Sequence, residues 1–223
     1  MWHFYYINRT LNDLTEEAFL KNISISELKA ITKIIVLDDD EFAFLESLQK
    51  SEFRIERRPD IQALSDVAEY DIILCDIRGV GKFLESQYEG AYLVKKLKEK
   101  YPKKIIISYT AGDYSADYQK FLGFADAIVP KGTSLEDWDS LLTSKLIALA
   151  NPIELWKKTR TALFDSDVPT IVVAKYEALY VKSVQNKSFD SMKKLISQKN
   201  NKESEILKSI LKTVAVKVIE RAI

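Results

Sequence analysis

Cysteine and histidine are almost absent from this 223-residue sequence, which contains one of each, Cys75 and His3. A single cysteine excludes a disulfide bond within the chain and fits a reducing compartment. A single histidine excludes a metal site built from several histidines, and also a Ser-His-Asp triad that needs an internal base. We interpret His3 as a strand residue without a chemical role, so any chemistry has to come from other residue types.

Long apolar runs and a net charge are also lacking. No stretch approaches the roughly 18 uncharged apolar residues of a membrane span, and the N-terminus lacks the basic start of a signal peptide. The 33 basic and 33 acidic side chains balance, so a wholesale nucleic-acid binder is not expected. With 47% hydrophobic residues the chain can bury a real core. We therefore expect a soluble, cytoplasmic protein with no membrane partner.

The balanced charge conceals a difference between two parts of the chain. Residues 1–150 hold 19 basic and 25 acidic side chains, whereas residues 151–223 hold 14 basic and 8 acidic ones. At the boundary, Asn151 can cap a new helix, Pro152 suits its first position, and Glu154 completes a capping box. We predict an N-terminal extension, a main domain and a helical C-terminal domain, at residues 1–32, 33–150 and 151–223.

The main domain alternates short apolar runs with amphipathic segments. Runs that are apolar at every position and rich in Ile and Val are typical of strands buried on both faces. They lie at residues 34–37, 72–75, 105–108 and 127–129, with a weaker edge strand at 53–55. Helical spacing of apolar residues falls between and after them, at 42–48, 61–68, 92–97 and 135–146. Five strands alternating with helices predict an α/β fold, a doubly wound parallel sheet with helices on both faces.

The two ends of the chain carry other patterns. In residues 2–7, Trp2, Phe4 and Tyr6 alternate with the residues between them, and this alternation predicts a strand. The capping box at 24–27 predicts a short helix. The C-terminal part is expected to be helical, with one helix that opens at Pro169 behind Asp167 as its cap. The last helix has an apolar stripe over residues 206–219. Such stripes are typical of a core or a dimer seam.

Polar side chains follow the ends of the expected strands. In an open parallel sheet, ligands bind beyond the carboxyl ends of the strands. Crowded carboxylates repel one another, and a hard divalent cation with oxygen ligands removes that repulsion. A lysine and a hydroxyl can hold the oxygens of a transferring phosphoryl group, and an aspartate can accept it as an acyl phosphate. These strand-end residues, which together predict a magnesium–phosphate site, are Asp38, Asp39, Asp40, Asp76, Ser108, Thr110 and Lys131.

Four stretches resemble the receiver domain of two-component response regulators. They are IIVLDDDE at 34–41, DIILCD at 71–76, IIISYTAGD at 105–113 and GFADAIVPK at 123–131. They occur in the family's order and cover roughly half the chain, about residues 33–149. The resemblance implies a flavodoxin-like five-stranded sheet of order 2-1-3-4-5 and a bacterial phosphorelay. It implies a signalling domain with at most autophosphorylation and autodephosphorylation activity rather than an enzyme.

The resemblance also implies roles for individual residues. A histidine kinase or phosphotransfer protein would supply the phosphoryl group from a phosphohistidine, with Mg²⁺ as cofactor. The fourth and fifth strands and their flanking helices would then shift and pass the signal on. The residues concerned are Asp38 and Asp39 as metal ligands, Asp76 as phospho-acceptor and metal ligand, the backbone carbonyl of Arg78 as a further ligand, Thr110 as switch hydroxyl and Lys131 as phosphate-pairing lysine.

Several positions depart from the family pattern. The loop at residues 77–89 contains no proline and is longer than usual. Gly132 follows Lys131 where the family usually has proline, and Ile128 stands where it usually has an aromatic residue. Arg78 lies two positions past the acceptor, where its side chain can reach the phosphoryl oxygens.

Three other functions stay open on the sequence alone. One is a degenerate receiver that docks proteins without phosphorylation. Another is a transcription regulator whose basic tail binds DNA, although the tail has no compact helix-turn-helix pattern and we favour dimerisation or docking of a partner through residues 151–223. A third is a haloacid-dehalogenase-type phosphatase that uses Asp38 and Asp40. That class needs a later acidic strand end, which is not found, and it leaves DIILCD unexplained.

Overall fold

The computed structural model describes residues 9–15, 23–111 and 116–221. These residues form two compact units. One is the sheet unit, Ile25–Leu146. The other is the helical unit, made of the described residues before Ile25 and after Leu146. The strand expected at residues 2–7 lies outside the described residues, and the domain boundaries inferred from the sequence stay a prediction.

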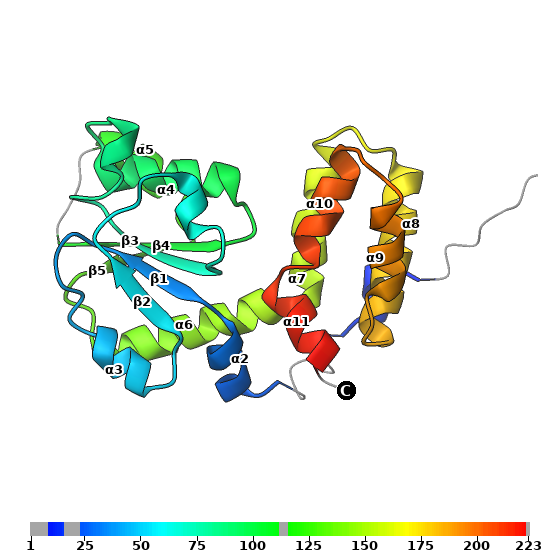
Figure 1. The fold of residues 1–223 in the computed structure, drawn as a ribbon, viewed down its shortest axis with the longest axis horizontal. Coiled ribbons are helices and arrows are strands. Elements are labelled where there is room, and N and C mark those ends of the chain that lie inside the picture. The colour runs from blue at the N-terminus through cyan, green and yellow to red at the C-terminus, as the bar shows by residue number, and fades with distance from the viewer. Residues whose placement is uncertain (1–8, 16–22, 112–115, 222–223) are drawn as a thin grey trace, which may run out of the picture. The chain divides into compact units, whose positions relative to one another are not determined.

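The sheet unit is built on five parallel strands in the order β2-β1-β3-β4-β5 (Figure 1). This order confirms the predicted flavodoxin-like fold class. The weak edge strand expected at 53–55 begins two residues later, at Ile55. The strands are β1 (Ile34–Leu37), β2 (Ile55–Arg58), β3 (Ile72–Asp76), β4 (Ile105–Thr110) and β5 (Ala127–Pro130).

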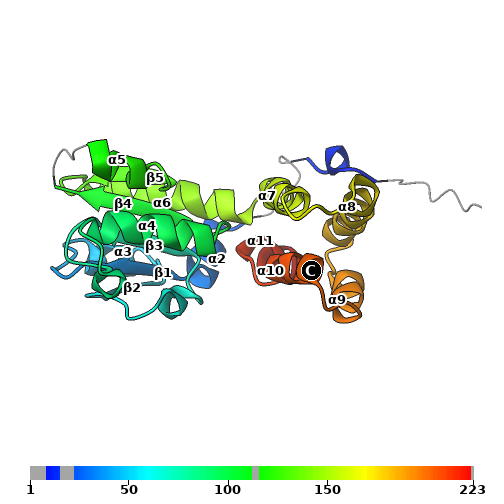
Figure 2. The same ribbon diagram turned by 90° about the horizontal axis from the view of Figure 1, so that it is seen from above.

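Helices cover both faces of this sheet. Helices α4 and α5 lie over one face, and α3 and α6 lie over the other (Figure 1, Figure 2). Helix α2 packs beside α6, where Lys29 Nζ lies 3.3 Å from Asp139 Oδ2. The helices are α2 (Ile25–Ile31), α3 (Leu45–Lys50), α4 (Glu89–Lys100), α5 (Ala116–Leu122) and α6 (Leu135–Ala150), together with the 3₁₀ turns η2 (Leu64–Val67) and η3 (Lys82–Leu84).

The core explains the apolar character of the central strands. All residues of β1, β3 and β4 are buried because helices cover the sheet on both sides. Burial of one such side chain stabilises the fold by about 1.5–3 kcal/mol. On the α4 face the packed core includes Ile35, Ile73, Ile106, Leu93, Val94 and Leu97.

The prediction of a helix at 61–68 is wrong, because the chain forms only the 3₁₀ turn η2 there. The Asp66 carboxylate accepts hydrogen bonds from the backbone N–H groups of Gln62 and Ala63, at 2.9 and 3.0 Å. These bonds close a single turn. The backbone N–H of Tyr70 then bonds to the carbonyl of Val67, and β3 begins two residues after Tyr70.

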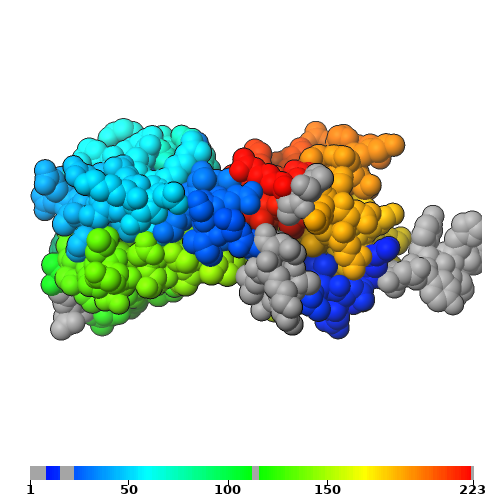
Figure 3. Space-filling model, turned by 90° about the horizontal axis from the view of Figure 1, so that it is seen from below, coloured from blue at the N-terminus to red at the C-terminus, as the bar shows by residue number. Residues whose placement is uncertain are grey.

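The helical unit contains the 3₁₀ turn η1 (Leu11–Asp13) and five helices after residue 151. The backbone N–H of Leu11 donates to Glu177 Oε1 at 3.1 Å, and the dark-blue residues 9–15 lie against α8 (Figure 3). In its core the ring of Trp156 stacks on that of Tyr180, with centroids 4.8 Å apart. The helices are α7 (Pro152–Phe164), α8 (Thr170–Gln185), α9 (Asp190–Ser197), α10 (Lys202–Ile210) and α11 (Val214–Arg221).

The helix ends agree with the sequence analysis in part. Asn151 caps α7, because its Oδ1 accepts from the N–H groups of Ile153 and Glu154, at 2.9 and 3.3 Å. The prediction that Asp167 caps the next helix is wrong: α8 begins after Pro169 as N-cap, and Asp167 occupies the turn before it with φ of 56°. None of the helices in the described part of the chain combines the length and apolar character that crossing a bilayer requires.

Candidate functional site

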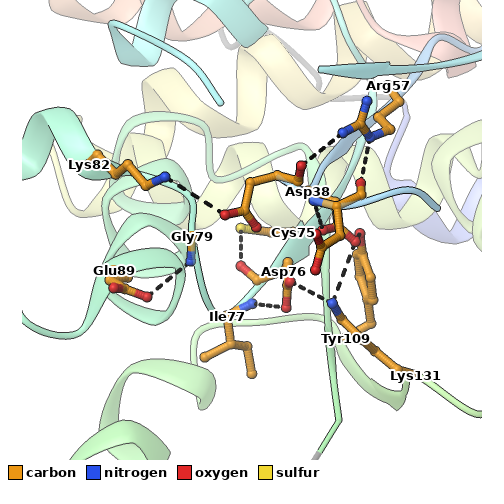
Figure 4. A network of polar contacts seen from close by, with 12 residues as sticks. Asp38, Arg57, Cys75, Asp76, Ile77, Gly79, Lys82, Glu89, Tyr109 and Lys131 are labelled. Carbon is orange, nitrogen blue, oxygen red and sulfur yellow. Dashed lines mark hydrogen bonds and ion pairs between the residues drawn. The ribbon is translucent and has the colours of Figure 1, made fainter. Parts of the chain in front are cut away.

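The ends of four strands meet at the carboxyl edge of the sheet. The strand register aligns Leu37 with Cys75, Asp76 with Tyr109 and Thr110 with Pro130. The residues that follow β1 and β5 therefore emerge beside the last residues of β3 and β4. Figure 4 shows side chains from these four strand ends pointing toward one another.

The centre of this edge is an ion pair between Asp76 and Lys131. The Lys131 ammonium donates to Asp76 Oδ2 at 2.7 Å and lies 3.6 Å from Asp38 Oδ2 (Figure 4). The other oxygen of Asp76, Oδ1, accepts from the backbone N–H of Ile77 at 2.6 Å. Both carboxylates are buried, with Asp38 at 1% and Asp76 at 3% exposure. One lysine therefore bridges two buried carboxylates.

The electrostatics of this group leave negative charge incompletely compensated. Burial raises the pKa of Asp76, and the neighbouring Asp38 adds to the rise, while the hydrogen bond and charge of Lys131 oppose it. Burial acts to lower the pKa of Lys131, but the hydrogen bond and charge of Asp76 outweigh it and the pKa is raised. Lys131 thus stays protonated, and two buried carboxylates share its single positive charge.

An acidic cluster extends the site toward the surface. Carboxylate oxygens of Asp38, Asp39 and Asp40 all lie within 4.8 Å of one another. The backbone N–H of Asp40 donates to Asp38 Oδ1 at 2.9 Å. Arg57 on β2 fixes the turn, because its guanidinium donates to the backbone carbonyls of Asp40 and Asp39, at 2.7 and 3.1 Å. The turn after β1 is therefore held by its own backbone and by β2.

Asp39 faces the loop that follows β3. A Cβ atom at Gly79 would lie 2.0 Å from Asp39 Oδ2, and Gly79 has φ of 73°. Only glycine fits both the backbone conformation and the close approach. Lys82 on the same loop places its ammonium 3.7 Å from Asp39 Oδ2 (Figure 4). The long loop therefore contacts the acidic cluster directly.

Two carboxylates accept hydrogen bonds from the backbone of this loop. Asp60 accepts hydrogen bonds from the backbone N–H groups of Gly81 and Lys82, at 2.7 and 3.1 Å. Glu89 accepts from the N–H of Gly79 at 3.0 Å (Figure 4). The first part of the loop, at residues 79–82, is therefore held in place by hydrogen bonds to Asp60 and Glu89.

Thr110 and Arg78 occupy different surroundings. Thr110 is the last residue of β4 and is 9% exposed, and its carbonyl accepts from the N–H of Lys131 at 2.7 Å. Arg78 holds its guanidinium over the ring of Tyr118, 4.8 Å from the centroid. That contact directs its side chain toward α5. The role of the Arg78 carbonyl as a metal ligand stays a prediction.

Tyr109 is a site residue that the sequence analysis missed. Its hydroxyl donates to Asp38 Oδ2 at 2.5 Å, and its ring lies edge-on to Phe42 and Trp138, with centroids 5.6 and 6.0 Å away. The available signal was a tyrosine near the carboxyl end of the strand, between Ser108 and Thr110. Its partner Asp38 is 71 residues away in the sequence, so the pattern alone did not pair them.

The residues fit a magnesium ion by their chemistry. Asp38 and Asp76 are buried carboxylates that share one lysine, and Asp39 adds an exposed carboxylate beside them. Mg²⁺ takes one or two carboxylates and keeps water or phosphate oxygens for its other positions. Burial, and to a smaller extent the charge of Asp38, raises the pKa of Asp76, and a divalent cation here would oppose both effects by stabilising the ionised carboxylates.

Comparison with known proteins adds solved structures only, because no family model and no curated protein matches this chain. The BeF3-activated N-terminal receiver domain of Klebsiella pneumoniae RstA is 22% identical with a TM-score of 0.44, and the match covers 52% of this chain and 98% of that one. A CheY-like receiver domain protein from Methanospirillum hungatei is 23% identical, with 52% and 94% covered and a TM-score of 0.43. The Vibrio cholerae chemotaxis protein CheY4 is 19% identical, with 52% and 98% covered and a TM-score of 0.42.

These similar structures are receiver domains, as the sequence resemblance predicts. At such low identity the likeness concerns the fold, and it spans about half of this chain. The described residues after β5 are mainly helical. The roles of individual residues therefore rest on the geometry of the site described above.

Proposed function

We propose that this chain is a phospho-accepting signalling protein. Asp76 takes a phosphoryl group from the phosphohistidine of a histidine kinase or phosphotransfer protein, with Mg²⁺, and the change is relayed to the helical region. One observation carries this proposal: the buried Asp76 carboxylate lies 2.7 Å from Lys131, which also faces Asp38. A nucleophile, a cation and a second carboxylate are thus present at one strand edge.

Phosphoryl transfer to Asp76 is a displacement at phosphorus. A carboxylate oxygen of Asp76 forms a bond to phosphorus while the phosphorus–nitrogen bond of phosphohistidine breaks, and the imidazole nitrogen keeps the electron pair. Bound Mg²⁺ supplies charge neutralisation for the phosphoryl oxygens. Lys131 is placed to pair with one of those oxygens, and the Thr110 hydroxyl, from the end of β4, is the group we assign to another.

The new charge gives the signal a physical basis. A phosphoryl group carries about −1.5 to −2 charges, so Lys131 exchanges its carboxylate partner for phosphoryl oxygens. Lys131 directly follows β5, and α6 begins four residues later, at Leu135. Helix α6 ends at Ala150, and α7 begins at Pro152. A shift of Lys131 is therefore carried along the chain toward the C-terminal helices.

The test is modification by a small phosphodonor. Wild-type protein incubated with Mg²⁺ and acetyl phosphate should gain one phosphoryl group, seen by intact-mass spectrometry, and should gain none when EDTA is added at the start. Asp76→Asn should gain none, because the nucleophile is gone. Asp117→Asn is the matched control, since Asp117 is exposed and pairs with Lys120 on α5, and it should behave like wild type.

Other outcomes would identify the alternatives. Wild type that is not modified with Mg²⁺ would favour a docking module that works without phosphorylation. Hydrolysis of small phosphate esters that is lost in Asp38→Asn but kept in Asp76→Asn would favour the phosphatase. Salt-sensitive binding of the intact chain to duplex DNA would revive the transcription regulator.

A further inference from the structure

Asp38 is held by two hydrogen bonds from different parts of the chain. Its Oδ1 accepts from the backbone N–H of Asp40 at 2.9 Å, and its Oδ2 accepts from the Tyr109 hydroxyl at 2.5 Å. Each carboxylate oxygen has two lone pairs, so each keeps one for a further partner. The two bonds therefore fix the plane of the Asp38 carboxylate and still leave it able to bind a cation.

The ring of Tyr109 has little freedom to move. It is 2% exposed and packs edge-on against Phe42 and against Trp138 of α6. Ring packing of this kind sets the position of the hydroxyl group. The hydroxyl is consequently a rigid donor aimed at Asp38 (Figure 4).

Tyr109 also affects how Asp76 and Asp38 share Lys131. Lys131 lies 2.7 Å from Asp76 Oδ2 but 3.6 Å from Asp38 Oδ2, where the Tyr109 hydroxyl is the closer donor. Asp38 is buried, and a buried carboxylate needs hydrogen-bond donors in place of the water that it has lost. Without the hydroxyl, Asp38 would have to turn toward Lys131 and compete with Asp76 for it.

We propose that Tyr109 is a positioning residue of the cation site, whose hydroxyl hydrogen bond fixes the orientation of the Asp38 carboxylate for Mg²⁺. This inference rests on the proposed function, because it concerns the same site. Groups that hydrogen-bond to a metal ligand, without binding the metal themselves, orient that ligand, and their loss typically lowers the metal affinity 10–100-fold. Tyr109 therefore acts through Asp38 and does not contact the reacting atoms.

The first test is the Mg²⁺ affinity of Tyr109→Phe, which keeps the ring and removes only the hydroxyl. Isothermal titration with Mg²⁺ alone should show binding about 10–100-fold weaker than in wild type. Tyr70→Phe is the matched control, because Tyr70 is also buried and also donates to a carboxylate, Glu56, away from the site. Its Mg²⁺ affinity should equal that of wild type. Equal affinity of Tyr109→Phe and wild type would overturn the proposal.

A second measurement avoids any folding defect of the variant. In wild-type protein, ring signals of Tyr109 can be assigned by NMR through their contacts with Trp138 and Phe42. They should shift on Mg²⁺ titration with the same midpoint as the backbone N–H of Asp38, whereas those of Tyr70 should not. Tyr109 signals that stay fixed while the Asp38 signal moves would overturn the proposal.

The outcomes separate this inference from the function on which it rests. Wild type that binds no Mg²⁺ would overturn both. Wild type that binds Mg²⁺ and is phosphorylated on Asp76, together with a Tyr109→Phe variant of unchanged affinity, would overturn only the role of Tyr109.

Discussion

At the scale of single residues, the site concentrates charge in a buried place. Asp76 and Asp38 both lie close to the Lys131 ammonium, and the pKa of Asp76 is raised by burial and by Asp38. A raised pKa in the folded state means that the ionised carboxyl is less favourable there than in the unfolded chain. The strand edge is thus organised for binding a cation or phosphoryl group at a cost in stability.

This cost predicts the behaviour of Asp76→Asn without Mg²⁺. The pKa of Asp76 is higher in the folded state than in the unfolded chain. The folded state therefore loses stability as the pH rises through these two pKa values, and the loss is complete above both. At pH 7 the variant should therefore be more stable than wild type, by about 1 kcal/mol, the usual size of single-residue effects. The measurement is urea unfolding in EDTA.

Acidification supplies the control for that prediction. Below both pKa values the wild-type carboxyl is protonated in either state, so the advantage of the variant should disappear. A variant less stable than wild type at pH 7, with the difference shrinking in acid, would mean that the ion pair with Lys131 stabilises the fold instead.

Residues such as Tyr109 mark the limit of prediction from sequence. Asp38, Asp39, Asp76, Thr110 and Lys131 could be proposed because each follows or ends an apolar run, and parallel strands bring such positions to one edge. The bond between Tyr109 and Asp38 depends on a side-chain direction within β4. Strand position alone does not report which distant carboxylate that side chain meets.

At the scale of elements, the strands were more predictable than the helices. Runs such as 34–37 and 72–75 are apolar throughout, which is typical of a strand buried on both faces. The stripe over 206–219 predicted one helix, but the chain breaks between α10 and α11. Thr213 there directs its hydroxyl and N–H to the carbonyl of Ile210, at 2.7 and 3.0 Å. Such local bonds compete with helical ones, and apolar periodicity does not register them.

The cap of α7 gives a prediction at this scale. Asn151→Ala removes the Oδ1 atom that accepts from the N–H groups of Ile153 and Glu154. The free energy of unfolding should fall by about 1 kcal/mol, within 0.5–2 kcal/mol. Chemical denaturation followed by far-UV circular dichroism measures it. Asn151→Asp, which retains a capping oxygen, should stay near wild type, and an Ala variant of equal stability would contradict the role of the cap.

At the scale of the whole molecule, the proposed ligands all come from the sheet unit. Binding to the folded state alone stabilises it by mass action, by about 2.7 kcal/mol at a concentration 100 times the Kd. Saturating Mg²⁺ should therefore raise the free energy of unfolding reported by Trp138, which lies next to Tyr109. Fluorescence in a variant that retains Trp138 as its only tryptophan measures this, and Asp38→Ala should show no gain.

The most direct test of the account is to locate the modified residue. After incubation with Mg²⁺ and acetyl phosphate, borohydride reduction converts an aspartyl phosphate to homoserine, which peptide mass spectrometry can place in the sequence. Homoserine is expected at position 76 in wild type and at no position when Mg²⁺ is left out. Homoserine at position 38 instead, or no conversion at position 76 in protein shown to bind Mg²⁺, would contradict it.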